Sequence, residues 1–274
     1  MSKDARAEED IEAEVDEFIK PHVEMRDFSG AILMAREGRI SVRKAYGMAN
    51  YELGVPNTPQ TKSHVASITK TFTAAAIMML QEERLLSVDD PIDQILPDYP
   101  RGELITPHHL LSHTSGIPNY DNFPDYNERM LRHSTLEETV AWFRDKPLEF
   151  EPGERRSYSN SNYVLLAHLI EAVSGESYEE FMQENIFHPL GMEDTGNFSH
   201  EAIVKNRAGG YAPGPNGLIN AVWYDKSFKM GSGSLYSTVE DLYKWDRALY
   251  TDRLLKKSSL ERMYAHGYGW GREN

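Results

Sequence analysis

The sequence predicts an α+β fold, on the evidence of a strand pair near its start, one long apolar helix and a mainly helical middle. Residues 31–46 hold two β-prone runs around a turn at Gly38, which is typical of a hairpin. Residues 67–83 place apolar side chains such as Phe72 at helical spacing without Gly or Pro, which predicts a buried helix. A chain of 274 residues can bury a substantial core, so we expect a single domain over residues 1–274.

Within that domain we expect residues 28–60 to form the hairpin part of the sheet and residues 61–250 a mainly helical region. An amphipathic helix should open the chain and end at Pro21. Residues 209–233 are rich in Gly, Pro, Asn and aromatics, which indicates a long irregular loop of the kind that lines a binding site. Further helices are predicted by Ser-x-x-Glu caps at Ser134 with Glu137, Ser177 with Glu180, and Ser237 with Glu240.

The composition excludes several classes of function. A net charge of −14 disfavours binding to nucleic acid or to an anionic membrane surface, because like charges repel. The absence of cysteine excludes disulfides, thiolate metal sites and a cysteine nucleophile. The start is acidic and has no apolar run typical of a secretory signal, and no window is long enough to span a bilayer. We therefore expect a soluble, cytoplasmic protein, unless a leader peptide has been removed.

Ser67 and Lys70 form a Ser-x-x-Lys tetrad at the start of the predicted apolar helix. Residues three apart lie on one helix face, so the hydroxyl and the amine can come within hydrogen-bonding reach. A partly desolvated lysine can accept the serine proton, and the N–H groups at a helix start can stabilise an oxyanion. Such tetrads are common as capped, solvated helix starts, but the apolar helix that follows favours a catalytic role here.

Tyr158 and Asn160 follow a turn at residues 152–153 and precede the next predicted helix. A tyrosine at this junction can share a proton with Lys70 and later protonate a leaving group. Asn160 can hold the lysine and donate to a substrate carbonyl. The alternative is an ordinary turn with a half-buried phenol.

Three loop aromatics, Tyr120, Trp223 and Tyr224, are candidates for the walls of a substrate cleft. Aromatic side chains in loops also serve simply as packing, so both interpretations stay open.

His109 and His113 have the i, i+4 spacing of a metal-binding pair, but no carboxylate base lies between them and no third ligand is evident. We therefore expect no metal site, and we expect His113 to hold the turn at residues 114–116.

Five ordered blocks carry a resemblance to a known family: Phe28–Met34, Val65–Lys70, Leu110–Gly116, Pro152–Gly153 with Tyr158–Asn160, and Gly231–Ser237. Together they resemble the penicillin-recognising serine hydrolases, the group of class C β-lactamases, D-alanyl-D-alanine peptidases and family VIII carboxylesterases. The resemblance implies a β-lactamase/transpeptidase-like fold, with an antiparallel sheet flanked by helices and a helical subdomain. It also implies that Ser67 forms the acyl-enzyme, that Lys70 and Tyr158 move protons, that Asn160 lines the site, and that no cofactor is needed.

The family's third motif, a His/Lys-x-Gly triplet on an edge strand, is missing from the sequence. It should follow the aromatic block at residues 268–270 by some tens of residues, whereas only residues 271–274 follow here. His266 precedes that block and is not a substitute. By resemblance, the missing part supplies further strands, a second oxyanion N–H and the closing helix. Exposed strand edges would then be places where a second copy or another chain can pair.

The main hypothesis is a serine hydrolase that acts through an acyl-enzyme on the ester or amide carbonyl of a small molecule, β-lactams and D-amino-acid peptides included. The expected cytoplasmic location favours esters or small amides. The alternatives are a truncated fragment of the full hydrolase, which we favour as the reason for the missing motif, or a non-catalytic scaffold that binds a partner.

Overall fold

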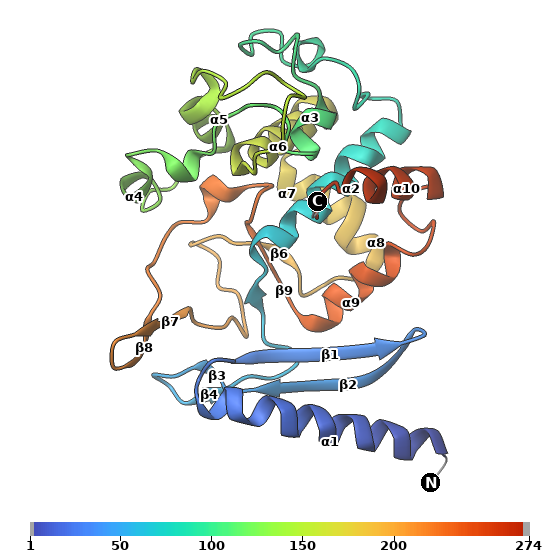
Figure 1. Ribbon diagram of the computed structural model, residues 1–274, viewed down its shortest axis with the longest axis vertical. Helices are drawn as coiled ribbons and strands as arrows, with labels where there is room; N and C mark the ends of the chain where they lie inside the picture. Colours follow the sequence, from blue (N-terminus) through green and yellow to red (C-terminus); the bar gives the residue numbers. More distant parts are fainter. Residues whose placement is uncertain (1–2, 271–274) are drawn as a thin grey trace. The chain divides into compact units, whose positions relative to one another are not determined.

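The computed structural model describes residues 3–270 (Figure 1). Contacts divide the chain into two compact units, the first made of Met1–Ser63, Ile203–Trp223 and Ser237–Arg247, and the second of His64–Ala202, Tyr224–Tyr236 and Ala248–Asn274. No helix within residues 3–270 is long and apolar enough to cross a membrane. The expectation of a single domain stays a prediction.

The predicted hairpin is confirmed in the first unit, where β1 (Gly30–Arg36) pairs antiparallel with β2 (Arg39–Tyr46). Glu37 and Gly38 both have positive φ, 53° and 80°, as the tight turn of a two-residue hairpin requires. Helix α1 (Lys3–Glu24) lies along this hairpin (Figure 1), and its Asp16 accepts hydrogen bonds from Lys44 and Tyr46 at 2.8 and 2.7 Å. Pairing of a second chain with a strand edge stays a prediction.

Helix α1 does not end at Pro21 as predicted but continues to Glu24. Proline lacks an N–H and so removes one hydrogen bond to the preceding turn, yet its carbonyl still accepts from the N–H of Met25 at 2.9 Å. A proline this close to the C-terminus leaves one more turn intact.

The predicted irregular loop over residues 209–233 is wrong in its first half. Strands β7 (Tyr211–Gly214) and β8 (Gly217–Asn220) form an antiparallel hairpin there. Gly217 has a φ of 121°, which suits the turn. Each strand is only four residues long, and a sequence rich in Gly and Pro does not predict strands this short.

The second unit is built around helix α2 (Thr69–Glu82), which packs against α6 (Asn160–Ser174). Of its 14 residues, 11 are buried, because the helix itself carries small or apolar side chains on nearly every face. The predicted helix over residues 67–83 is thus confirmed, with a 3-10 turn, η1 (Ala66–Ile68), leading into it. Since the first turn of α2 is buried too, Lys70 is carried into the interior.

The remaining elements are short. The strands are β3 (Met48–Asn50), β4 (Val55–Pro56), β5 (Ser63–His64), β6 (Gly196–Asn197) and β9 (Leu235–Ser237). The α-helices are α3 (Pro107–Leu111), α4 (Tyr126–Arg129), α5 (Leu136–Arg144), α7 (Tyr178–Met182), α8 (His188–Leu190), α9 (Val239–Ala248) and α10 (Lys257–His266). The other helical turns are η2 (Ile92–Gln94), η3 (Tyr120–Asn122), η4 (Gln183–Phe187) and η5 (Ser227–Lys229). Strand β9 lies between β5 and β6 in a three-stranded sheet.

One predicted helix cap is confirmed and two are wrong by one residue. The Ser177 hydroxyl accepts from the N–H of Glu180 at 3.2 Å, as predicted for α7. At α5 the cap is Thr135 in place of Ser134, and at α9 the Thr238 hydroxyl accepts from the N–H of residue 241 at 3.3 Å. In both places a threonine next to the predicted serine stands directly before the first helical turn.

Candidate active site

Ser67 lies in η1, immediately before α2, with its side chain exposed to solvent. The preceding residue, Ala66, has a φ of 45°, which costs conformational energy in a residue with a Cβ and is found where surrounding structure fixes the backbone. Lys70, one turn further along, is only 2% exposed. The hydroxyl therefore faces solvent while the amine lies behind it.

Three oxygen atoms surround the Lys70 amine. Nζ lies 3.3 Å from Ser67 Oγ, 2.7 Å from Asn160 Oδ1 and 2.5 Å from the carbonyl oxygen of Ser232. The amide and carbonyl oxygens can only accept hydrogen bonds, whereas the Ser67 hydroxyl can also donate. A neutral amine can give its two N–H bonds to Asn160 and Ser232 and turn its lone pair toward the Ser67 proton.

The pKa of Lys70 is lowered to about 7, mainly by burial and also by the positive charge of Lys229, while the Asp121 carboxylate opposes part of the shift. The cause is desolvation, which penalises the ammonium more than the neutral amine. A lysine with this pKa is a usable base near neutral pH.

Tyr158 completes the group on the solvent side of the amine. Its hydroxyl lies 2.9 Å from Ser67 Oγ and donates to Asn160 Oδ1 at 3.1 Å. Burial raises the pKa of Tyr158, although the hydrogen bond with Ser67 opposes the shift. Near neutrality Tyr158 therefore keeps its proton while Lys70 can lose one, which is how a paired acid and base are recognised.

The orientation of the Asn160 side chain is set by Asp121, a residue that the sequence analysis missed. Asn160 Nδ2 donates to Asp121 Oδ2 at 2.6 Å, so the amide oxygen turns toward Lys70. The other Asp121 oxygen lies 3.4 Å from Nζ of Lys229. Asp121 belongs to none of the short motifs in the sequence, and no local pattern pointed to it.

Gly231 brings the Ser232 carbonyl to the lysine. Its φ is 73°, and a Cβ there would lie 2.5 Å from the carbonyl oxygen of Tyr163 and 2.7 Å from Ala167 Cβ, both on α6. Only glycine lets this turn approach α6 so closely. Residues 231–237 form one of the five sequence blocks, but a block of residue types does not show that a backbone carbonyl contacts Lys70.

The three predicted cleft aromatics differ in burial. Tyr120 is fully buried, so it cannot form a cleft wall; its hydroxyl lies 3.2 Å from Ser232 Oγ, and its ring stacks on Trp142. Tyr224 is half-buried in the same unit, with its ring centroid 6.4 Å from that of His64. Trp223 is 59% exposed and belongs to the first unit. Loop sequence did not distinguish a buried aromatic from an exposed one.

Each of the two histidines of the i, i+4 pair has a structural contact. His109 Nδ1 accepts from the N–H of Thr106 at 3.2 Å and closes the capping box of α3. His113 Nδ1 accepts from the N–H of Ser159 at 3.3 Å, and its carbonyl accepts from the N–H of Ser157 at 2.9 Å. Burial lowers the pKa of His113 to about 3, so the ring stays neutral. His113 thus aligns the segment that carries Tyr158.

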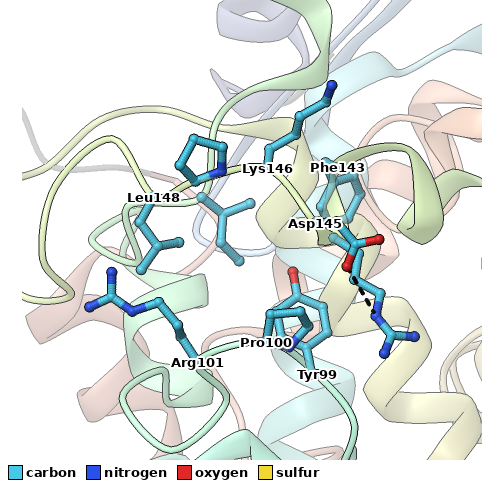
Figure 2. A pocket seen from close by; sticks show the side chains of 10 residues that line it. Tyr99, Pro100, Arg101, Phe143, Asp145, Lys146 and Leu148 are labelled. Atoms are coloured by element: carbon cyan, nitrogen blue, oxygen red, sulfur yellow. Dashed lines mark ion pairs between the residues drawn. The ribbon is translucent and has the colours of Figure 1, made fainter.

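A cavity of about 350 Å³ in the second unit is separate from this group (Figure 2). Tyr99, Phe143 and Leu148 contribute to its lining, and Arg144 faces Asp145 at 3.9 Å. Ser67, Lys70 and Tyr158 do not line it. The candidate site is therefore defined by side-chain chemistry and not by this cavity.

The chain belongs to the Beta-lactamase family, whose family model matches residues 15–273. This confirms the resemblance to penicillin-recognising proteins inferred from the five sequence blocks.

Individual relatives agree with this assignment. The chain is 32% identical to penicillin-binding protein 4* of Bacillus subtilis (strain 168), over 92% of this chain and 61% of that protein. It is 29% identical to the teichoic acid D-alanine hydrolase of Staphylococcus aureus, over 79% of this chain and 53% of that protein. The chain thus spans about three fifths or less of these relatives' lengths.

Solved structures confirm the predicted α+β, β-lactamase/transpeptidase-like fold. The octameric penicillin-binding protein homologue from Pyrococcus abyssi superposes with a TM-score of 0.80 and 36% identity, over 92% of this chain and 59% of that one. D-amino acid amidase from Ochrobactrum anthropi SV3 gives a TM-score of 0.81 and 27% identity, over 92% and 73%.

Replacing Gly231 tests whether the close approach to α6 is needed. We expect Gly231→Ala to lower the free energy of unfolding by about 1–3 kcal/mol more than a glycine replacement that causes only backbone strain, because the added methyl group overpacks the contact. Gly175→Ala is the matched control, since Gly175 follows the last residue of α6 with a φ of 76°, and a Cβ added there would have no atom within 4 Å. Urea unfolding of both variants measures the difference. Equal losses would mean that the Gly231 turn can move away from α6.

Proposed function

We propose that this chain is a serine hydrolase that forms an acyl-enzyme on Ser67 and acts on ester or amide carbonyls. The observation that carries the proposal is the buried Lys70 amine, with a pKa of about 7. Of the three oxygen atoms that its hydrogen bonds reach in the described part of the chain, only Ser67 Oγ, 3.3 Å away, can donate a proton to it. This arrangement makes an exposed serine nucleophilic without a histidine.

In the proposed reaction, Ser67 Oγ attacks the carbonyl carbon while its proton moves to Lys70 Nζ. N–H groups at the start of η1 stabilise the oxyanion, because the first N–H groups of a helical segment have no acceptor in a preceding turn. The N–H groups of Ile68 and Thr69 are not available for this, since they donate to the carbonyls of Val65 and Ala66. When the tetrahedral intermediate collapses, the Tyr158 hydroxyl gives its proton to the leaving group and regains one from Lys70. Water then attacks the ester on Ser67, with Lys70 and Tyr158 moving protons in the reverse direction, and releases the acid.

For the substrate we propose D-amino acyl esters and amides. The support is comparative: one relative is named a teichoic acid D-alanine hydrolase, and one structural neighbour a D-amino acid amidase. Both names include a D-amino acid.

Covalent labelling tests the nucleophile. We expect a fluorophosphonate to add one label to the parent chain and none to Ser67→Ala, as measured by intact mass. Ser63→Ala is the control, because Ser63 is an exposed serine on β5, and the oxygen atoms that accept from Lys70 belong to Ser67, Asn160 and Ser232; it should label like the parent. A label that persists in Ser67→Ala would exclude Ser67 as the nucleophile. No label on the parent would favour the non-catalytic binding protein.

The pH dependence of acylation tests the base. Because the neutral amine is the active form, the acylation rate should rise with pH through the Lys70 pKa of about 7. Lys229→Met removes the charge that lowers this pKa, so the acid limb should move to higher pH. Asp121→Asn removes the charge that raises it, so the limb should move to lower pH. Stopped-flow labelling across pH 5–9 would show both shifts, and shifts in the same direction would contradict the assignment.

A matched substrate pair tests the acyl group. We expect D-alanine p-nitroanilide to be cleaved faster than the L-isomer, measured by release of p-nitroaniline from the parent chain, with Ser67→Ala as the blank. Equal rates for both isomers would reject the D-amino acyl proposal and leave the labelling result unaffected.

A further inference from the structure

We propose that His133, His200 and Asp225 form a binding site for one divalent transition-metal ion of the zinc class. The three residues come from three loops of the second unit, and their ligand atoms all lie within 4.8 Å of one another. Asp225 Oδ2 is 3.1 Å from His200 Nδ1 and 3.9 Å from His133 Nδ1. The expectation of no metal site concerned only His109 and His113; His133, His200 and Asp225 are far apart in the chain and form no short motif.

The donor set suits zinc. Two imidazole nitrogens and one carboxylate oxygen are the protein ligands of many open zinc sites, in which water takes the fourth position. In a tetrahedral shell with bonds of about 2.0–2.2 Å, the ligand atoms lie about 3.3–3.6 Å apart. The observed separations of 3.1 and 3.9 Å reach this range through small rotations of the two histidine side chains, which are 47% and 62% exposed. The same exposure gives the ion access from solvent.

The carboxylate is already held in place. Asp225 is 5% exposed, and its Oδ1 accepts from the N–H of Ser227 at 2.9 Å, which leaves Oδ2 facing the histidines. A buried carboxylate needs a positive partner. The basic groups that lie within 4 Å of it in the described part of the chain are the two imidazoles, which are charged only when protonated.

The backbone around the site is also preorganised. The N–H of Asp225 donates to the carbonyl of Met130 at 2.9 Å, and the N–H of Ser134 donates to Ser227 Oγ at 2.9 Å. These two hydrogen bonds tie the loop of His133 to the loop of Asp225 on either side of the proposed ligands. Two of the three ligands are thus fixed relative to each other before an ion binds.

Asp225 lies at the start of the segment whose Ser232 carbonyl accepts a hydrogen bond from the Lys70 amine. From Asp225 the chain runs through η5 to Lys229, which faces Asp121, and then to Ser232, whose carbonyl accepts from Lys70. An ion at Asp225 would anchor the start of this segment, so metal binding should stabilise the fold around Lys70. The proposal does not depend on the proposed hydrolase activity.

Metal titration after chelator treatment and dialysis tests the site. We expect calorimetry with ZnCl₂ to show one ion bound per chain, and Co²⁺ to give visible absorption bands typical of a site with nitrogen ligands. The thermal midpoint should rise with Zn²⁺ by mass action, since the ion binds the folded chain.

Variants decide which residues bind the ion. His133→Ala and His200→Ala change exposed side chains, so both variants should fold normally, which circular dichroism verifies. Each should weaken Zn²⁺ binding by tenfold or more, and a tenfold change corresponds to about 1.4 kcal/mol of binding free energy. Asp225→Asn should abolish binding. His188→Ala is the control, because His188 is exposed and faces Glu184 at 3.4 Å outside the cluster; it should bind like the parent. The absence of stoichiometric binding by the parent, or unchanged binding in both histidine variants, would overturn the proposal and leave a simple ion pair.

Discussion

The burial of one amine, that of Lys70, is the constraint on which the site depends. A lysine in the interior loses its hydration, and this cost must be offset by hydrogen-bond acceptors placed around it. Asn160 Oδ1 and the Ser232 carbonyl provide them. Each is held in turn by a more distant group, Asn160 by Asp121 and Ser232 by the close contact of Gly231 with α6. Segments far apart in sequence are therefore organised around a single nitrogen atom.

The parts of the site that sequence could predict are those set by local geometry. Ser67 and Lys70 share one helix face, and Tyr158 and Asn160 share one turn, so short motifs describe their placement. The structure brings these four together. Their roles in catalysis remain proposals.

The residues that sequence missed or misplaced act over long distances. Asp121 is 39 residues from the side chain it orients, and Ser232 acts through its carbonyl, which every residue type has. Tyr120 was predicted to form a cleft wall because the sequence of a loop does not show whether its aromatic side chains are buried or exposed, and the structure buries this one. Tertiary packing made the difference in each case. The same limit explains the β7–β8 hairpin, whose pairing a Gly- and Pro-rich sequence does not show.

The chemistry of the acceptors around Lys70 has a consequence for leaving groups. An amide oxygen and a backbone carbonyl accept hydrogen bonds but do not take up a proton at neutral pH. In the proposed reaction, a proton taken from Ser67 can therefore leave Lys70 only toward the side that Ser67 and Tyr158 occupy. A basic leaving group, such as an amine, removes that proton as it departs and resets the lysine for the attack of water. A leaving group that departs as a stable anion takes no proton, so the ammonium has to lose its proton by way of Tyr158, which is 43% exposed to solvent. In the proposed reaction, the basicity of the departing group thus decides whether Lys70 loses its proton to the leaving group or to solvent.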